Sequence, residues 1–558
     1  MFKPAIISAL VKQTKLRKEE IESLIEIPPN PELGDFAFPC FILSKKEKKS
    51  PVEVASNLVK KLGKIENIQT IKATGPYINF FVDKNRLAEE IIKINSNYGR
   101  SNIGKKRKLV IDFSAPNIGK PMHIGHIRST ILGDSITRIY DYLNYDTIGI
   151  NYLGDIGLHI GKLIVAYELW LDKEALKLDP VQELLRLYVK FCAKEKTKIT
   201  EGAEEEFQDN EWTNKAKDKL KQIEFGDEKT ISVWKEIKKH SEIGFNKVYD
   251  LLKVNFTETI GQSHFSDKGK QLVMNALRDN IAKREKDGAV YVELNGQKKY
   301  ILRNNETAAY ITQDLGAALE RYKKYNFDKM IYITDFRQEQ HFDSLFTILK
   351  LLGYDWADKL IHLKFGTVKF GNEIIASRTG DIILLEDVLK KTIEKASKEI
   401  KKRKTKGDPE KVGVGAVKYT IIKNEPIKDV NFSWEQALSF EGNTGPYLQY
   451  SYARASSIIR KAKSKSKPKI KDLTNSEILL LNKISTFPEV VKQAAEKLNP
   501  ALIANYSFEL AQVFNEFYHN CPVIGSKEES FRLSLIESFR TTLKNSLHLI
   551  GIEVMEEM

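Results

Sequence analysis

Cysteine is scarce in this sequence, and no long hydrophobic stretch is present. The three cysteines, Cys40, Cys192 and Cys521, are odd in number and lie far apart among 558 residues. This pattern argues against a disulfide framework and favours reduced thiols in a cytoplasmic protein. A membrane-spanning helix needs about 20 consecutive apolar residues. No run in the sequence approaches that length, so we expect no membrane segment.

Charged residues, by contrast, are abundant. Lysine and arginine number 89 and aspartate and glutamate 75, which gives a net charge of +14 and an isoelectric point near 9.1. A basic protein attracts polyanions over long distances, so a nucleic acid is the favoured partner. A general richness in lysine would raise the charge in the same way without any nucleic acid. The length predicts several domains, and a hydrophobic content of 42% is enough to build their cores.

One stretch, residues 114–128, organises the chain. It follows an apolar run at 109–113 that is typical of a buried strand, and it leads into residues 127–143, whose apolar side chains recur at helical spacing. Two prolines stiffen this stretch, and two glycines make its backbone permissive. We therefore predict a strand-to-helix turn. Open α/β sheets bind ligands at such turns, where a helix N-terminus can also bind phosphate.

The side chains of this turn suit a nucleoside triphosphate. Lys120, His123 and His126 supply hydrogen-bond donors, and Gly125 leaves room for a flat base against its backbone. Two histidines three residues apart could instead be zinc ligands. Zinc needs a third and usually a fourth ligand, and no cluster of cysteine and histidine accompanies this pair. We therefore expect no zinc.

The rest of the chain is organised around repeats of strand, glycine-rich turn and helix. A second repeat lies at residues 146–159, and this rhythm predicts an α/β, doubly wound, Rossmann-type domain with a parallel sheet. Residues 288–303 alternate like a β-hairpin around Asn295-Gly296, and residues 365–375 suggest another. We predict an α+β N-terminal domain at 1–105, the Rossmann-type domain at 106–385 with a helical insertion at about 175–250, a helical connection at 386–429 and an all-α C-terminal domain at 430–558.

A helix predicted at residues 306–322 carries a candidate pocket for a cationic side chain. Tyr310 and Asp314 are four residues apart, so they project from one helix face. A carboxylate can hold a guanidinium through two parallel hydrogen bonds, and a tyrosine hydroxyl can accept a third. An aspartate on a helix is more often solvated or paired with a neighbouring lysine, and spacing alone favours that interpretation.

Several segments resemble the arginyl-tRNA synthetases. His123-Ile124-Gly125-His126 matches the signature of class I aminoacyl-tRNA synthetases, and residues 114–128 closely resemble the arginyl enzymes. Residues 310–317 match that family's arginine-binding segment, and residues 438–454 match the start of its anticodon-binding domain. The resemblance spans essentially the whole chain and is strongest at 108–160, 306–342 and 430–454. It implies ATP-dependent activation of L-arginine and its transfer to the 3′ end of tRNA(Arg).

The resemblance also implies roles for individual residues. Arginine would be held by Asn117, Tyr310, Asp314 and Gln338. The catalytic groups would be Lys120, His123, His126 and Arg378. ATP would be bound by His123, Gly125, His126, His341 and Arg378, with Mg²⁺ carried mainly by phosphate oxygens. We expect a monomer and no editing domain, because a pocket built for a guanidinium can discriminate by about 10⁴–10⁵.

The chain departs from the family pattern at two places. The second class I signature, a lysine-bearing loop that grips the triphosphate, is reduced at residues 375–380 to a segment in which Arg378 keeps the charge, and the resemblance assigns the compensating role to Lys120. Gln262 stands where the family usually has glutamate. We expect arginine activation to depend on bound tRNA. The alternatives are a catalytically inactive synthetase-like tRNA-binding protein and a tRNA-independent nucleotidyltransferase, the latter disfavoured by the two terminal modules.

The tRNA contacts implied by the resemblance lie at both ends of the chain. Asn79 of the N-terminal domain would touch the corner of the tRNA, although capping of a strand is the favoured explanation of this residue. Tyr447, Tyr450 and Arg454 share a helix face, and aromatic faces stack unpaired bases at about 1–3 kcal/mol each. These tyrosines could equally pack between helices. Two weaker candidates for anticodon contacts are Tyr518 and Met558.

Overall fold

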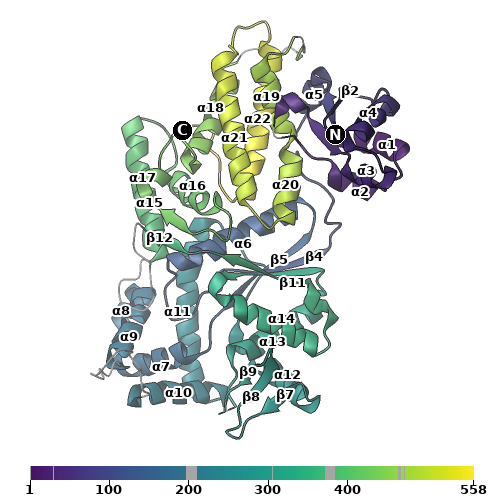
Figure 1. Ribbon diagram of the computed structural model, residues 1–558. Helices are drawn as coiled ribbons and strands as arrows, with labels where there is room; N and C mark the ends of the chain where they lie inside the picture. Colours follow the sequence, from purple (N-terminus) through teal and green to yellow (C-terminus); the bar gives the residue numbers. More distant parts are fainter. Residues whose placement is uncertain are drawn as a thin grey trace, which may run out of the picture. The chain divides into compact units, whose positions relative to one another are not determined.

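A computed structural model describes residues 2–28, 30–195, 210–304, 306–370, 384–462, 467–470 and 472–558 (Figure 1). The chain forms two compact units. The first contains Met1–Tyr98, Ala455–Phe487 and Glu509–Leu543, and the second contains Gly99–Arg454, Pro488–Phe508 and Lys544–Met558. The α/β catalytic fold lies in the second unit. Among the described residues, no helix is both long and apolar enough to cross a membrane.

A five-stranded sheet with the order β11-β10-β4-β5-β6 forms the centre of the second unit. All four pairings are parallel. The chain begins in the middle strand, adds β5 and β6 on one side, and then returns to add β10 and β11 on the other. The strands are β4 (Lys108–Asp112), β5 (Asp146–Leu153), β6 (Glu258–Gly261), β10 (Lys329–Asp335) and β11 (Leu360–Phe365). The predicted doubly wound, Rossmann-type sheet is confirmed, and its direction switches between β4 and β10.

Helices cover both faces of this sheet (Figure 1). Helix α6 packs against β4, β5 and β10. The opposite face shares a continuous apolar cluster with three other helices, which includes Val110, Ile150 and Met330 from the strands and Leu315 and Leu345 from the helices. The helix on the first face is α6 (Ile124–Tyr142). The helices on the opposite face are α12 (Ser266–Arg278), α13 (Tyr310–Tyr325) and α14 (Glu339–Leu351). Burial on both faces explains why the sheet strands read as continuous apolar runs.

The segment after β6 contains one confirmed element and one that is shifted. Strands β8 (Val290–Leu294) and β9 (Gln297–Leu302) form the predicted antiparallel hairpin, and β7 (Ala282–Arg284) pairs with β8. Asn295 and Gly296 both have positive φ, as a tight two-residue turn requires. The helix predicted from residue 306 begins at Tyr310 instead, because Ala308 still bridges to Leu302 and Ala309 is extended.

The described parts of the region between β5 and β6 are helical, and the bounds of the predicted insertion stay a prediction. It contains α7 (Leu158–Trp170), α8 (Lys173–Leu178), α9 (Pro180–Glu195), α10 (Glu211–Glu224) and α11 (Glu228–Leu252). The turn between α10 and α11 includes Gly226, whose φ of +84° suits glycine. Helix α11 has 25 residues and runs back toward the sheet (Figure 1).

The segment that follows β11 differs from the sequence-based expectation. Strand β12 (Val368–Phe370) pairs in parallel with β13 (Val430–Phe432). The hairpin predicted for residues 365–375 is therefore wrong in its described part, because the partner of β12 lies about 60 residues further on. Residues 371–375 lie outside the described residues. The later elements of this unit include α15 (Leu385–Arg403), α16 (Pro409–Ile422) and α17 (Trp434–Ala437).

The first unit combines an N-terminal α+β layer with parts of the C-terminal helices. Its sheet has the order β1-β3-β2 and is antiparallel. The N-terminal elements are α1 (Lys3–Gln13), α2 (Lys18–Leu24), β1 (Phe36–Pro39), α3 (Phe41–Glu47), α4 (Pro51–Leu62), β2 (Ile68–Thr74), β3 (Tyr77–Val82) and α5 (Lys84–Ile91). The Lys84 ammonium donates to the Asn482 side chain at 3.0 Å, and the Ser538 hydroxyl donates to the Ile91 carbonyl at 2.8 Å.

Five long helices make up the C-terminal part of the chain. They are α18 (Gly445–Lys461), α19 (Asn475–Ser485), α20 (Phe487–Glu496), α21 (Ala501–Asn520) and α22 (Glu529–Leu549). All of them except α19 continue across a boundary between the two units. The predicted all-α character of this region is confirmed. The domain boundaries predicted from the sequence stay a prediction.

Candidate active site

The two histidines of the first signature form the N-terminal cap of α6. His123 is the N-cap residue, and its Nδ1 accepts a hydrogen bond from the Gly125 amide at 3.0 Å. Nδ1 of His126 accepts in turn from the His123 amide at 3.1 Å. Because each Nδ1 is an acceptor, a neutral ring must carry its proton on Nε2. Each imidazole can therefore donate a hydrogen bond from Nε2 while its other nitrogen caps the helix.

Both of these histidines are held neutral. Burial, followed by the charge of Lys120, lowers the pKa of His123 to about 4. Burial, followed by the neighbouring His123, lowers the pKa of His126 to about 3. The two ring centroids are 4.0 Å apart, so a positive charge on one would be repelled by a charge on the other. At neutral pH the pair can act as hydrogen-bond donors to an anion without becoming charged.

The depressed histidine pKa values predict a loss of stability in acid. An unfolded histidine titrates near 6.5, whereas His123, His126 and His159 titrate near 4, 3 and 4 in the folded protein. As the pH falls below 6.5, the unfolded chain binds protons on these histidines while the folded chain does not. The free energy of unfolding should then fall by up to about 1.4 kcal/mol per pH unit for each histidine. Burial raises the pKa of Asp112 to about 6. Protonation of this carboxyl therefore acts in the opposite direction and raises the free energy of unfolding as the pH falls.

Urea denaturation at pH 7 and pH 5 would test this expectation. The unfolding midpoint should be lower at pH 5, and the difference between the two pH values should shrink in a His126→Gln variant, which has one histidine fewer to protonate. Equal midpoints for the unsubstituted protein at the two pH values would contradict the prediction.

The loop before α6 is joined to the end of β5. The Gly154 amide donates to the Pro116 carbonyl at 3.0 Å, and the Ile118 amide donates to the Gly154 carbonyl at 3.1 Å. The Asn117 side chain lies directly over Gly154, since a Cβ atom at that position would be 1.9 Å from Asn117 Oδ1. Gly154 therefore sets the position of Asn117, one of the predicted arginine-binding residues.

The backbone of the same loop adopts an uncommon conformation where it leaves β4. Ser114 and Ala115 have φ values of +73° and +48°, in the left-handed region. Residues with a Cβ pay roughly 1–2 kcal/mol each there. Buried hydrogen bonds hold this turn, including one from the Ser114 amide to Ser129 Oγ at 2.9 Å and one from Thr130 Oγ1 to Ser114 Oγ at 2.8 Å.

Lys120 contacts an aromatic ring of the inserted helices. Its Nζ lies 4.5 Å from the ring centroid of Tyr188 on α9, a distance typical of a cation–π contact. Burial and the nearby Cys192 raise the pKa of the Tyr188 hydroxyl above its ordinary value. The charge of Lys120 also contributes to lowering the pKa of His159, after burial, to about 4. Tyr188 and His159 thus join the residues around the first signature loop.

The predicted arginine pocket lies on α13 and α14. Nε2 of His341 donates to Asp314 Oδ2 at 2.6 Å, and the Asp314 side chain is 15% exposed. Tyr310 is the first residue of α13 and is half exposed. Its hydroxyl lies at the turn after β5, 3.0 Å from where a Cβ on Gly157 would stand. His341 was expected near the nucleotide; its hydrogen bond is to Asp314 of the predicted arginine pocket, and its contact with ATP stays a prediction.

A buried ion pair lies beneath this pocket. Arg321 donates to Asp112 Oδ2 at 2.7 Å, and both side chains are almost fully buried. The guanidinium also lies 4.5 Å from the Tyr152 ring centroid. Burial raises the pKa of Asp112 to about 6, and the attraction of Arg321 opposes that rise. Arg321, the cation nearest to this pocket on α13, is therefore paired with Asp112 and not with Asp314.

The other residues predicted to lie near arginine or the phosphates differ in how far they are exposed to solvent. Gln338 ends the short 3₁₀ turn (Phe336–Gln338) after β10 and is exposed. Oε1 of Gln262 is buried and has no hydrogen-bond partner in the structure. Gly125 is exposed beside the histidines. Arg378 and the rest of the reduced loop at 375–380 lie outside the described residues.

The tRNA candidates are placed as follows. The Tyr447 ring centroid is 5.7 Å from that of Phe508, and Arg454 lies over the Tyr450 ring with 4.9 Å between guanidinium carbon and centroid. Helix packing thus accounts for part of the Tyr447 surface. Asn79 in β3 is only 3% exposed, so β3 would have to be uncovered before this side chain could reach RNA. Tyr518 is partly exposed and Met558 is half-buried.

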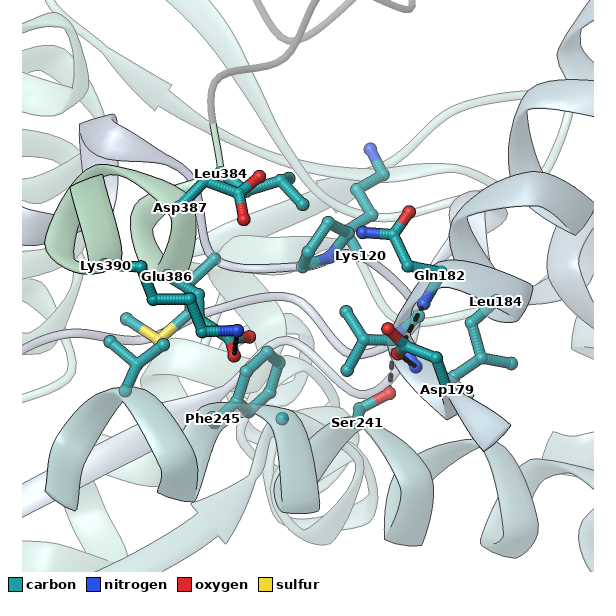
Figure 2. Close-up of a pocket in the computed structure, with 16 residues that line it drawn as sticks. Lys120, Asp179, Gln182, Leu184, Ser241, Phe245, Leu384, Glu386, Asp387 and Lys390 are labelled. Carbon is teal, nitrogen blue, oxygen red and sulfur yellow. Dashed lines mark hydrogen bonds and ion pairs between the residues drawn. The ribbon is translucent and has the colours of Figure 1, made fainter. Parts of the chain in front are cut away.

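A cavity lies behind the first signature loop (Figure 2). It is bordered by Lys120 and Met122 from the loop, by Leu184 from α9, by Phe245 from α11 and by Asp387 from α15. Of the described residues predicted to be catalytic or to bind ATP or arginine, the catalytic candidate Lys120 alone belongs to its lining. No group of three or more His, Cys, Asp or Glu side chains that could hold a metal ion occurs within the described ranges.

Comparisons with known proteins agree with this arrangement. Three family models match: the arginyl tRNA synthetase N-terminal domain at residues 2–82, the catalytic domain of class I (R) tRNA synthetases at 89–434 and the DALR anticodon-binding domain at 448–558. Proteins named arginine–tRNA ligase from Clostridium perfringens and Clostridioides difficile are 38% and 39% identical to the chain, each over 100% of both sequences. These full-length relatives disfavour the inactive alternative.

Solved structures show the same fold. The arginyl-tRNA synthetase of Thermus thermophilus matches with a TM-score of 0.82 at 24% identity, over 100% of this chain and 99% of its own. That of Plasmodium falciparum matches with a TM-score of 0.80 at 24% identity, over 100% and 98%. Sequence and fold agree over the whole length, and the chain belongs to the arginyl-tRNA synthetases of class I.

Proposed function

We propose that this arginyl-tRNA synthetase activates L-arginine with ATP and transfers it to tRNA(Arg) by means of the strand-end site around β4, β5 and β10. The observation that carries this assignment is the Asp314 carboxylate, which is fixed by His341 at 2.6 Å and lies on the same helix as Arg321, whose guanidinium pairs with Asp112 instead. A carboxylate in that setting suits a guanidinium, which can donate two parallel hydrogen bonds to its two oxygens, a geometry that other cationic side chains match poorly.

In the first step, an oxygen of the arginine carboxylate attacks the α-phosphorus of ATP, and the bond to the pyrophosphate oxygen breaks. Asn117 and Gln338 hold the backbone end of arginine. The Nε2–H groups of His123 and His126 donate to phosphate oxygens. Lys120 leaves the Tyr188 ring and meets the charge that develops on the pyrophosphate, while Arg378 closes on the same group. Mg²⁺ accompanies ATP and is held mainly by its phosphate oxygens.

In the second step, a hydroxyl of the 3′-terminal ribose of tRNA attacks the carbonyl carbon of arginyl-adenylate. The hydroxyl proton is released, and AMP leaves. None of the proposed side chains forms a covalent intermediate, so catalysis depends on alignment and charge stabilisation. Tyr447, Tyr450, Arg454, Tyr518 and Met558 are the candidates for anticodon contacts, with Asn79 as the candidate at the tRNA corner. We expect a monomer that works in the cytoplasm.

Charging of total tRNA with labelled arginine would test the proposal, with labelled lysine and glutamine as parallel controls. We expect arginine alone to appear on tRNA, at a rate proportional to the enzyme concentration. Tight tRNA binding without any charging would contradict it and would direct attention to the reduced loop at 375–380. Measuring ATP–pyrophosphate exchange with and without tRNA would show whether arginine activation depends on tRNA.

A further inference from the structure

The inserted helix α11 contacts the ends of two neighbouring strands, β4 and β5, with one of its faces. Trp234, Lys238, Ser241 and Tyr249 are spaced by four, three and eight residues, so they share one side of an α-helix. None of them stands out in the sequence as a catalytic residue. Each nevertheless makes a hydrogen bond or ion pair with a strand-end loop of the active site.

Ser241 contacts the first signature loop. Its hydroxyl donates to the Ile237 carbonyl of its own helix at 2.7 Å and accepts from the Gly119 amide at 2.8 Å. Gly119 has a φ of +77° and directly precedes Lys120. Figure 2 shows Ser241 projecting from α11 toward this loop, with the Lys120 side chain extending away from it. The buried hydroxyl thus fixes the backbone from which Lys120 projects.

Lys238 and Trp234 contact the end of β5. The Asp155 carboxylate is fully buried and accepts from Lys238 Nζ at 2.8 Å, while the Asp155 carbonyl accepts from Trp234 Nε1 at 2.7 Å. The same carboxylate accepts from both the amide and the hydroxyl of Ser263, at 2.8 and 2.9 Å. Through the Asp155 carboxylate, α11 is therefore also connected to the turn that follows β6.

Tyr249 contacts the ends of two strands at once. Its hydroxyl lies 2.8 Å from Ser114 Oγ and accepts from Asn151 Nδ2 at 3.1 Å. Ser114 opens the left-handed turn after β4, and Asn151 lies near the end of β5. A single hydroxyl therefore joins two adjacent strand ends. It does so at the turn where Ser114 and Ala115 adopt the unfavourable left-handed conformation.

We propose that α11 is the element that positions the active site, and that Tyr249 is a positioning residue for the first signature loop. Tyr249 touches neither ATP nor arginine in this scheme. It acts through Ser114, which holds the turn leading to Asn117 and the two histidines. This inference rests on the proposed function, because it concerns the rate of arginine activation. It assigns a role to an insertion that otherwise looks like a solvated helical linker.

Tyr249→Phe tests the proposal, because phenylalanine keeps the ring that packs against Phe256 at 4.9 Å and removes only the hydroxyl. We expect arginine-dependent ATP–pyrophosphate exchange, measured with tRNA present, to fall about fivefold per active site. Active sites would be counted from the burst of arginyl-tRNA formed. A partly unfolded sample would lower that count but not the rate per counted site.

Tyr167→Phe is the matched control. Tyr167 on α7 is also buried and donates a hydrogen bond to Glu236 of α11 at 2.8 Å, so the described partner of its hydroxyl lies on a helix and not in a strand-end loop. We expect its exchange rate per site to stay within twofold of the unsubstituted protein. If Tyr249→Phe yields no countable sites, Ser241→Ala replaces it, with the same expected loss.

The outcomes separate this inference from the function on which it rests. An unsubstituted protein without arginine-dependent exchange would overturn the proposed function. If the unsubstituted protein does show exchange, and the rate per site of Tyr249→Phe is within twofold of its rate, the positioning role is overturned. A loss of equal size in Tyr167→Phe would also overturn it, because any lost hydroxyl in the inserted region would then have the same effect.

Discussion

Replacement of Asp314 by asparagine is expected to lower kcat/KM for arginine by about 10²–10³-fold. Asparagine keeps the shape of the side chain and can still accept from His341, so the local packing survives. It removes the charge that a guanidinium requires. Breaking a buried ion pair by removing one partner costs about 3–5 kcal/mol, and each 1.4 kcal/mol is a factor of ten. Because the Asp314 side chain keeps 15% exposure, we expect the lower part of that range.

The measurement is steady-state aminoacylation with arginine and ATP varied separately. KM for arginine should rise steeply while KM for ATP changes little. Asp343→Asn, at an exposed position on α14, is the matched control because it makes the same chemical change at the surface. A kcat/KM for arginine within threefold of the unsubstituted enzyme in the Asp314 variant would remove this residue from the pocket.

Local sequence patterns were enough to predict the parallel sheet, whereas the binding of a ligand at its edge stays a prediction. Buried strands appear as apolar runs because both faces of a parallel sheet are covered, and glycines mark the turns that follow them. The order of the strands, with β10 and β11 on the far side of β4, was not predicted and required the structure. The hairpin predicted at residues 365–375 was wrong because β12 pairs with β13, and local alternation carries no information about a partner about 60 residues away.

The chemistry of the site could be predicted only in part. Tyr310 and Asp314 lie on one helix, so helical spacing relates them to each other. The partner of Asp314 is 27 residues away on another helix, and periodicity cannot show that contact. The resemblance had placed His341 near the nucleotide. Its hydrogen bond to Asp314 is a tertiary contact that required the structure.

The inserted helices show the limit of sequence reasoning most clearly. Tyr188 and Tyr249 are aromatic residues in charged, helix-forming segments, and such residues usually pack within a core. Their contacts with the first signature loop span 68 and 135 positions of the chain, respectively. A signal that could have indicated them is the burial of tyrosine hydroxyls, since a buried hydroxyl needs a partner. That rule predicts a partner but not its identity.

Replacement of Gly154 by alanine is expected to lower kcat/KM for arginine by about 10- to 100-fold with little loss of stability. A Cβ at this position would lie 1.9 Å from Asn117 Oδ1. The end of a side chain can rotate away, so the fold survives, but the Asn117 amide leaves its place. Losing a hydrogen bond to a charged group costs about 1.5–3 kcal/mol, which corresponds to the expected factor if Asn117 holds the arginine backbone.

A double-mutant cycle would identify the cause. Gly154→Ala and Asn117→Ala should each reduce kcat/KM, and Gly154→Ala should add little in the Asn117→Ala background, because the side chain with which it collides is already gone. Gly407→Ala is the control, since its Cβ would meet its neighbours at ordinary contact distances of 3.4 Å and more. Additive effects of the two substitutions would show that Gly154 acts through the backbone bonds to Pro116 and Ile118. Asn117 would then need another explanation for its position over the end of β5.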